Sequence, residues 1–218
     1  MDALVRFAQD AHATLPLDLL GGLTLLSVAP FVLVMCTSFV RIVVVLSLVR
    51  SAIGAAALPP NTVLTGLALV LTLSVMSPAI DRIGREAVQP YRQGRISQSA
   101  FIERAAAPLR AFMLRQAHTD DVLLFERVAH LAPHPAAQVP PAVLIPAFAV
   151  GELRDAFAIG FALYLPFVAI DLAVAAVLMG LGMVMLSPPV VSLPLKLLLF
   201  VSVNGWALVC AGVAESFR

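Results

Sequence analysis

The hydrophobic and polar positions of this chain are most informative near its carboxyl end, where two long apolar stretches follow one another. Residues 156–186 carry one charged side chain, Asp171, and residues 187–214 carry one, Lys196. Each stretch exceeds the roughly 20 apolar residues that cross the hydrocarbon core of a bilayer. The Ser-Pro-Pro sequence at 187–189 separates them. The pattern therefore predicts a hairpin of two helices of membrane-spanning length.

Two further apolar segments lie nearer the amino end. The first covers 19–49 and is interrupted by Pro30, and proline usually kinks or breaks a helix. The second covers 61–80 and contains no charge, and Pro78 favours a stop or kink near its end. The sequence SAIGAAALPP between them contains a glycine and a proline pair, which favour a turn. Residues 19–80 are therefore predicted to form a first helical hairpin.

A polar insert connects the two hairpins and carries eight arginines and six acidic residues. The spacing of its apolar residues predicts a helix over 97–116 and a short helix over 119–127, capped by Thr119 or Asp120. The predicted fold is all-α, with two long hairpins of membrane-type hydrophobicity. Its predicted parts are an amino-terminal lead-in (1–18), the first hairpin (19–80), the insert (81–146) and the second hairpin (147–218).

Composition supports a membrane-associated class. Hydrophobic residues make up 61% of the chain and charged residues 12%, against about 45–50% and 25% in soluble domains. The mean hydropathy is +0.98. A net charge of +1 gives no reason to expect nucleic acid as a partner. Arginines that closely follow the second segment place the insert in the cytoplasm by the positive-inside rule, although this rule weakens for loops longer than about 60 residues.

Four polar side chains within the apolar segments are candidate functional residues. A carboxylate at the centre of a membrane helix costs about 2.5–3.5 kcal/mol on insertion scales, so Asp171 requires a partner. A hairpin that turns near residue 188 places Asn204 level with Asp171, which predicts a hydrogen bond between them. Lys196 and Arg41 are expected to snorkel towards a wet surface or to contact another subunit. Asp171 either locks the structure or serves transport or gating.

A cluster of methionines precedes the second turn. Met179, Met183 and Met185 alternate with glycines at 180 and 182. Methionine side chains are flexible, so a ring of them can close a pore and still yield, and glycines permit the backbone to leave the regular helix. Two interpretations stay open, a gate and ordinary core filling.

The sequence carries no pattern typical of an enzyme, a cofactor site or a metal site. It contains no nucleotide-binding loop and no nucleophile–base arrangement. Cys36 and Cys210 lie in apolar runs and are expected to be buried side chains without a metal. His130 and His134 are four residues apart, but prolines between and after them exclude a regular helix. The charged run at 151–157 is expected to be a helix start, with acids in its first turn.

Two long parts of the chain, 30–78 and 145–206, carry distinctive runs of residues. In order, the runs are TSF-x-R-I, LPPN-x-VL, ELR-x-AF-x-IGF, PF-x-x-ID and SLP-x-K-x-LLF. With these runs the chain resembles the FliP/SctR (YscR/HrcR-like) family of type III secretion export-apparatus proteins. Residues 30–78 are similar to the family's first hairpin and residues 145–206 to its second. A variable insert lies between the two parts, as it does in the family.

The resemblance implies a core subunit of the type III export gate, which conducts unfolded secretion substrates across the bacterial inner membrane. In the family several copies, expected here as a pentamer, join FliQ/SctS-like and FliR/SctT-like subunits in a helical cone around the channel, with FlhB/SctU-like and FlhA/SctV-like subunits as further partners. The family's methionine gasket falls on Met179, Met183 and Met185. The cone is partly raised out of the lipid bilayer, and the insert is expected on the periplasmic side, against the charge rule.

Some positions depart from the family pattern. Leu181 and Val184 stand where further methionines are common, and Gly151 replaces the usual serine before Glu-Leu. Asn204 stands where aspartate is common, which removes the repulsion between two level carboxylates. The short chain and a start with no clear signal peptide favour an injectisome member, with a role in virulence, over a flagellar one.

Two other classes of protein are alternatives to this interpretation. A small secondary transporter would use Asp171 as its coupling carboxylate and commonly shows an internal repeat, but the two hairpins share no convincing similarity. A membrane-embedded enzyme would need a catalytic constellation, which the sequence lacks.

Overall fold

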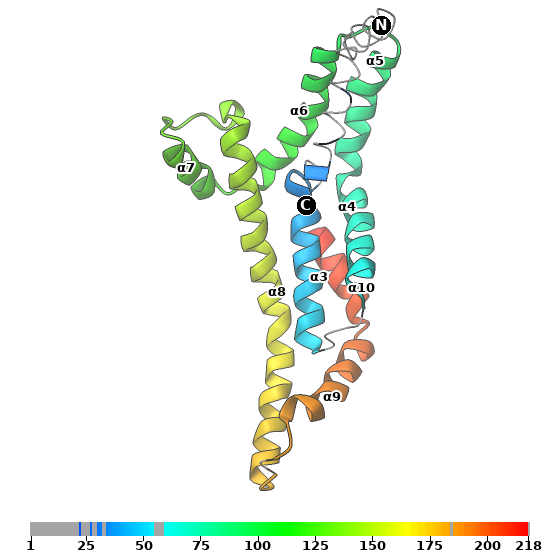
Figure 1. Ribbon diagram of the computed structural model, residues 1–218, viewed down its shortest axis with the longest axis vertical. Coiled ribbons are helices and arrows are strands. Elements are labelled where there is room, and N and C mark those ends of the chain that lie inside the picture. The colour runs from blue at the N-terminus through cyan, green and yellow to red at the C-terminus, as the bar shows by residue number, and fades with distance from the viewer. Residues whose placement is uncertain are drawn as a thin grey trace, which may run out of the picture.

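The computed structural model describes residues 22, 27, 30–31, 34–54, 59–183 and 185–217, and over these residues the chain is helical, with no strand (Figure 1). The all-α prediction is confirmed. The predicted lead-in at 1–18 lies outside the described residues. In order, the helices are α3 (Phe39–Ile53), α4 (Asn61–Ile83), the π-helical turn η1 (Gly84–Val88), α5 (Gln89–Arg92), α6 (Gln98–Gln116), α7 (Thr119–Val128), the 3-10 turn η2 (Ala136–Gln138), α8 (Pro141–Gly180), α9 (Pro188–Ser202) and α10 (Gly205–Glu215).

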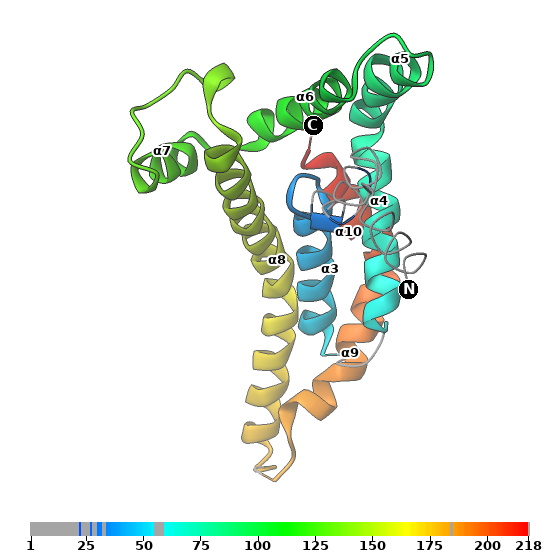
Figure 2. The same ribbon diagram turned by 45° about the horizontal axis from the view of Figure 1, so that its top comes forward.

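Helix α3 is the centre of the fold. It packs against α8, α4, α9 and α10, and Figures 1 and 2 both show it between α8 and α4. A helix that is apolar on all sides is typical of such a position. The helix break predicted at Pro30 is wrong. Pro30 is helical, and the interruption lies at 36–38, directly before α3 begins. The end of α3 confirms the predicted turn, with Gly54 at φ 83°.

Close packing of α3 on α8 depends on small side chains. Ala156 of α8 is fully buried. At Gly160, a Cβ atom would lie 2.3 Å from Cδ1 of Leu48 in α3. This is closer than two carbon atoms that are not bonded to each other can approach. Small residues four positions apart allow two helices to approach in this way.

The long helix that begins with α4 runs past the predicted stop at Pro78. It continues through η1 and α5 to Arg92, and the 61–92 stretch is long and apolar enough to cross a membrane. Interior proline removes one hydrogen bond and can be tolerated when packing compensates. Every fourth residue of α4 from Leu64 to Met76 is buried, so one continuous stripe holds this helix against the core.

Helix α8 is the other long helix, with 40 residues from Pro141 to Gly180. It begins six residues before the predicted start of the second hairpin at 147 and passes through Pro146 and Pro166. The predicted boundaries of the insert, at 80–81 and 146–147, therefore both fall inside continuous helices. The charged run at 151–157 begins ten residues after the start of α8 at Pro141, so its predicted role as a helix start is wrong.

The insert forms the predicted helices. Helix α6 confirms the one expected over 97–116, with Ser97 Oγ accepting a hydrogen bond from the amide of Ala100 at 3.3 Å. Helix α7 confirms the short one, but its cap is His118 rather than Thr119 or Asp120. Figures 1 and 2 show α7 standing out to the side of the first turns of α8.

The carboxyl-terminal apolar segment is two helices instead of one. Helices α9 and α10 meet at an angle of 64°, and Asn204 between them has φ 51°. The preceding turn confirms the predicted hairpin, since α8 ends at Gly180 and α9 begins at Pro188. Counting the bent pair as one span, up to three described segments are long and apolar enough to cross a membrane.

Candidate functional site

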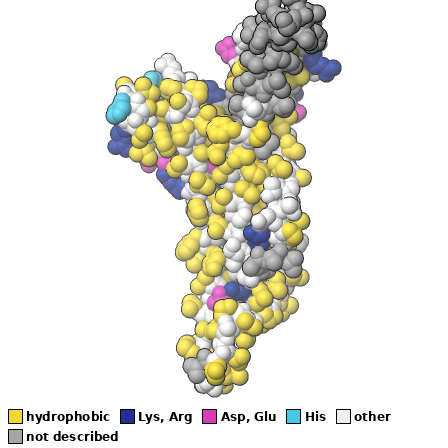
Figure 3. Space-filling view, in the orientation of Figure 1, with side chains coloured by type: hydrophobic (Ala, Val, Ile, Leu, Met, Phe, Trp, Pro, Cys, Tyr) yellow, Lys and Arg dark blue, Asp and Glu magenta, His cyan; other side chains and the backbone are white. Residues whose placement is uncertain are grey.

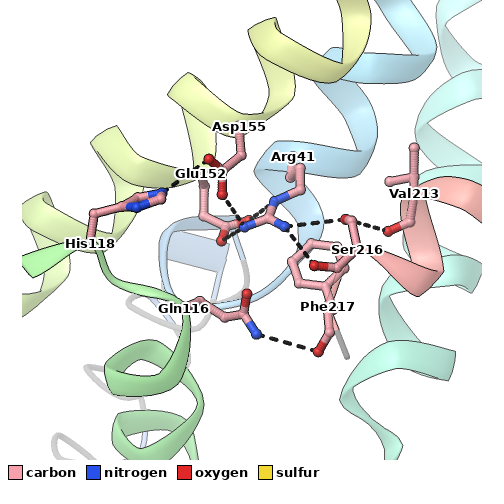
Figure 4. Close-up of polar contacts among 8 residues, drawn as sticks. All are labelled: Arg41, Gln116, His118, Glu152, Asp155, Val213, Ser216 and Phe217. Carbon is pink, nitrogen blue, oxygen red and sulfur yellow. Dashed lines mark hydrogen bonds and ion pairs between the residues drawn. The ribbon is translucent and has the colours of Figure 1, made fainter.

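A buried polar cluster joins α3, α8 and the residues after α10 (Figure 4). We call Arg41, Glu152, Asp155 and Ser216 the Arg41 cluster. The Arg41 guanidinium donates to both carboxylate oxygens of Glu152, with Nε–Oε2 at 3.0 Å and Nη2–Oε1 at 2.6 Å. Nη2 lies 2.8 Å from Asp155 Oδ2, and Nη1 lies 3.2 Å from both the carbonyl oxygen and Oγ of Ser216. One side chain thus fixes three parts of the chain.

The segment after α10 is also tied to the insert. The ring of Phe217 lies beneath the Arg41 guanidinium, 4.1 Å from its carbon, and stacks on Phe112 of α6 with centroids 6.1 Å apart. Gln116 Nε2 donates to the carbonyl oxygen of Phe217 at 3.3 Å. The end of α10, the insert and the two central helices therefore meet at the Arg41 cluster.

The Arg41 cluster contains a residue that the sequence patterns did not single out. Glu152 is fully buried and Arg41 is 3% exposed, so the expectation that Arg41 snorkels to a wet surface is wrong. Its partners here lie in its own chain. The available signal was the spacing of Glu152 and Asp155, because residues three apart share one face of a helix. Two acids on one face inside an apolar helix require a cation.

A second polar cluster, the Asp171 cluster, joins α8 to α9 near their common end. It consists of Asp171, Ser192 and Lys196. Ser192 Oγ donates to Oδ1 of Asp171 at 2.5 Å, and Lys196 Nζ donates to Oδ2 at 2.6 Å. Ser192 and Lys196 are buried and are four residues apart, so they share one face of α9. The cluster neutralises both lone charges of the two apolar stretches.

This geometry corrects two predictions. Asp171 pairs with Lys196 rather than with Asn204, and Lys196 does not snorkel, because it is 6% exposed. The reason is the place of the turn: Asp171 lies nine residues before the end of α8 at Gly180, and nine residues past Pro188 is position 197, next to Lys196.

Asn204 instead forms the bend between α9 and α10. It takes a left-handed conformation, φ 51° and ψ 49°, and its side chain makes no capping hydrogen bond. Asparagine tolerates this conformation better than most residues. The next residue, Gly205, packs directly against Phe200, where a Cβ would lie 2.3 Å from the ring. The sequence Asn-Gly therefore permits the sharp bend.

We expect Asp171→Ala to impair assembly of the protein complex more than its conductance. The change leaves Lys196 buried without a counter-ion and removes two hydrogen bonds, at a cost of about 1–3 kcal/mol. The measurement is the yield of assembled complex after detergent extraction, compared with Ser192→Ala, which keeps the ion pair and is expected to lose less. Normal assembly with lost export would instead assign Asp171 to transport.

The methionine cluster lies at the tip of the α8–α9 hairpin, at the lower end of Figure 1. Met179, Met183 and Met185 are 66%, 45% and 100% exposed, so within one chain they do not fill a core. Gly182 has φ 71°, which a side chain would oppose. The tip thus presents three flexible apolar side chains away from the rest of the chain.

Metal-binding groups are not assembled in the described part of the chain, where no three His, Cys, Asp or Glu side chains form a set that could hold an ion. His134 contacts Glu126 instead, with Nδ1–Oε1 at 3.1 Å. Cys36 is a buried free thiol, as predicted, whereas Cys210 is a free thiol that is only half-buried against the core.

Comparison with known proteins gives consistent matches over nearly the whole chain. The FliP family model matches residues 22–213. The flagellar biosynthetic protein FliP of Pectobacterium carotovorum is 50% identical over 205 residues, which are 94% of this chain and 80% of that protein. The protein of the same name from Caulobacter vibrioides is 48% identical over 202 residues, 92% and 76% of the two chains. That from Bacillus subtilis is 42% identical over 210 residues, 96% and 94% of the two chains.

These relatives correct the expectation of an injectisome member with a role in virulence. All three are flagellar proteins by name. Chain length was a poor guide, because the Bacillus subtilis protein is flagellar and the match covers 94% of it. The coverage and the sequence identity show that this chain belongs to the FliP family, whose members are components of the type III export gate.

Proposed function

We propose that this chain is a core subunit of the flagellar type III export gate and that several copies, a pentamer by family resemblance, form a cone around a channel. Unfolded secretion substrates pass through this channel across the bacterial inner membrane. The chain performs no chemistry and holds no cofactor. Its part is to shape the channel wall and to close it at rest.

The observation that carries this proposal is the amount of apolar surface that one chain leaves uncovered. In the apolar 18-residue stretch of the 61–92 helix only 22% is buried within the chain, and in the corresponding stretch of α8 only 17% is buried. Figure 3 shows hydrophobic side chains over most of the visible face of the long helices. An apolar cavity of about 260 Å³ also opens at the bend between α9 and α10, lined by residues such as Phe167, Phe200 and Leu208. Surfaces of this kind require lipid or neighbouring subunits.

Neighbouring subunits are the preferred cover. Further copies of this chain, FliQ/SctS-like and FliR/SctT-like subunits would complete the cone, with FlhB/SctU-like and FlhA/SctV-like subunits beside it. A helix interface in a membrane relies on close packing and polar contacts, and the Arg41 and Asp171 clusters hold the helices of each copy in the register that such packing needs. Nucleic acid has no place in this assembly.

Placement in the membrane follows the family. The chain inserts in the bacterial inner membrane, the insert faces the periplasm, and the assembled cone is partly raised out of the lipid. The methionine tips of the copies converge in the channel as a gasket formed by Met179, Met183 and Met185. Their exposure in one chain, on a turn with a glycine in the left-handed region, supports this role.

The transporter alternative loses support from the Asp171 cluster. A coupling carboxylate must exchange its ion or proton during the cycle, whereas both oxygens of Asp171 are engaged by Ser192 and Lys196. Both of these contacts join α8 to α9, as a structural lock requires.

The proposal is tested in the bacterium that encodes this chain. An in-frame deletion of the gene is expected to abolish secretion of extracellular flagellar proteins while leaving their synthesis intact, and the wild-type gene on a plasmid is expected to restore it. Secretion and motility that persist at the wild-type level after deletion would exclude a core role in flagellar export.

A further inference from the structure

The short helix α7 is held to α8 by polar contacts, one of which is made to Asp155 of the Arg41 cluster. We call residues 118–128 the α7 arm. His118, at the start of the arm, places Nε2 at 3.0 Å from Oδ1 of Asp155. Asp121, one turn further on, accepts a hydrogen bond through Oδ1 from Arg154. The His118 side chain is 41% exposed, so water and protons reach it.

Backbone packing brings the His118 ring close to α8. At Gly151 of α8, a Cβ would lie 3.0 Å from Cδ2 of His118 and 3.5 Å from Oδ2 of Asp121. Asp121 is 2% exposed, and its Oδ2 atom has no hydrogen-bond partner among the described residues. A buried carboxylate oxygen without a donor is costly unless positive charge lies near it.

The side chains around His118 are mainly acidic. The groups that surround it are Asp121 and the exposed Asp120 of α7, Glu152, Arg154 and Asp155 of α8, and Arg41 of α3. Acidic side chains outnumber the two guanidiniums of Arg41 and Arg154 in this set. A protonated His118 adds a positive charge beside Asp155, which its Nε2 contacts at 3.0 Å.

We propose that His118 is a proton-dependent latch that fastens the α7 arm to α8. Histidine is the side chain whose charge ordinarily changes between about pH 5 and 8. The protonated ring forms a charge-assisted bond with Asp155, which is stronger than the neutral one. The latch is therefore stronger at pH 5.5 than at pH 7.5, where histidine is ordinarily neutral.

The latch is independent of the gate assignment, because it depends only on contacts between the α7 arm and residues 151–155 of α8. If the insert faces the periplasm, the arm responds to the pH outside the inner membrane. The latch then strengthens when the periplasm becomes acidic.

Hydrogen exchange measured by mass spectrometry tests the latch in the detergent-extracted protein with its partners bound. Protection factors of α7 amides, corrected for the intrinsic pH dependence of exchange, are compared between pH 5.5 and 7.5, with α6 amides as an internal reference. Wild-type protection is expected to be about fivefold higher at pH 5.5. His118→Arg, which is always charged, is expected to give the high value at both pH values. His118→Gln carries an amide that can donate a hydrogen bond but has no charge. It is expected to give the low protection factor at both pH values.

Two histidines on the neighbouring loop provide matched controls. His130→Gln removes a histidine that makes no ion pair among the described residues, and His134→Gln removes one that contacts Glu126; both are expected to keep the pH dependence of the α7 amides. Wild-type protection that does not change with pH, a His118→Arg protein that still loses protection at pH 7.5, or a pH dependence abolished by His134→Gln and kept by His118→Gln would each overturn the proposal. Gel filtration confirms that every variant is folded.

Discussion

Arg41→Ala is expected to prevent the chain from entering the export complex. The change leaves Glu152 fully buried and without its cation, and removal of one partner from a buried ion pair costs about 3–5 kcal/mol. It also frees Ser216 and Phe217, which tie the end of α10 to α3 and α6. The measurement is the amount of the chain that co-purifies with its partners, together with secretion of flagellar proteins.

Arg50→Ala is the matched control for this change. Arg50 belongs to the same helix and donates to Asn61 and the carbonyl oxygen of Pro59 at its exposed end, so its loss is expected to cost less than about 1 kcal/mol. The double change Arg41→Met with Glu152→Leu removes both charges and is expected to recover part of the assembly lost in Arg41→Ala. Equal assembly of Arg41→Ala and wild type would show that the cluster does not organise the fold.

Replacing Met179, Met183 and Met185 together with alanine is expected to raise the ion leak of the closed complex several-fold and to leave assembly intact. The three side chains are exposed within one chain, so their truncation removes no packing there. It does remove the flexible apolar groups that are proposed to fill the constriction. The leak is measured as ion conductance across bilayers that contain the purified complex.

A matched truncation separates the seal from a general loss of apolar surface. Leu172 of α8 is also 66% exposed but lies away from the tip, and Leu172→Ala is expected to leave the leak unchanged. Replacing the three methionines with leucine keeps most of the volume and is expected to retain part of the seal. An assembled triple-alanine complex with the wild-type leak would remove the gasket assignment.

Hydropathy predicted where the long helices lie but not where each begins and ends. Runs with at most one charge identified α4, most of α8 and the segment that forms α9 and α10, and prolines and glycines located the turns near Gly54 and Pro188. The family resemblance added the export-gate assignment, which the matching relatives support. The gasket and assembly roles of the candidate residues remain proposals.

The partners of the buried charges could not be obtained from the pattern. The position of the turn decides which residue of the returning helix lies beside Asp171. An error of a few residues in that position led to the prediction of Asn204 as its partner, whereas the partner is Lys196. Glu152 escaped notice because a charged run beside an apolar stretch is ordinarily a helix end, whereas here the helix had begun at Pro141. The bend at Asn204 was missed for a related reason, since apolar composition continues through it and only the backbone conformation changes.

Native mass spectrometry of the detergent-extracted complex, after co-expression of this chain with its neighbouring membrane genes, tests the central claim most directly. The account predicts a large hetero-oligomer that contains several copies of this chain, five by family resemblance, together with smaller helical partners. A monomer or a simple dimer without partners would contradict the export-gate role and return the transporter alternative to consideration.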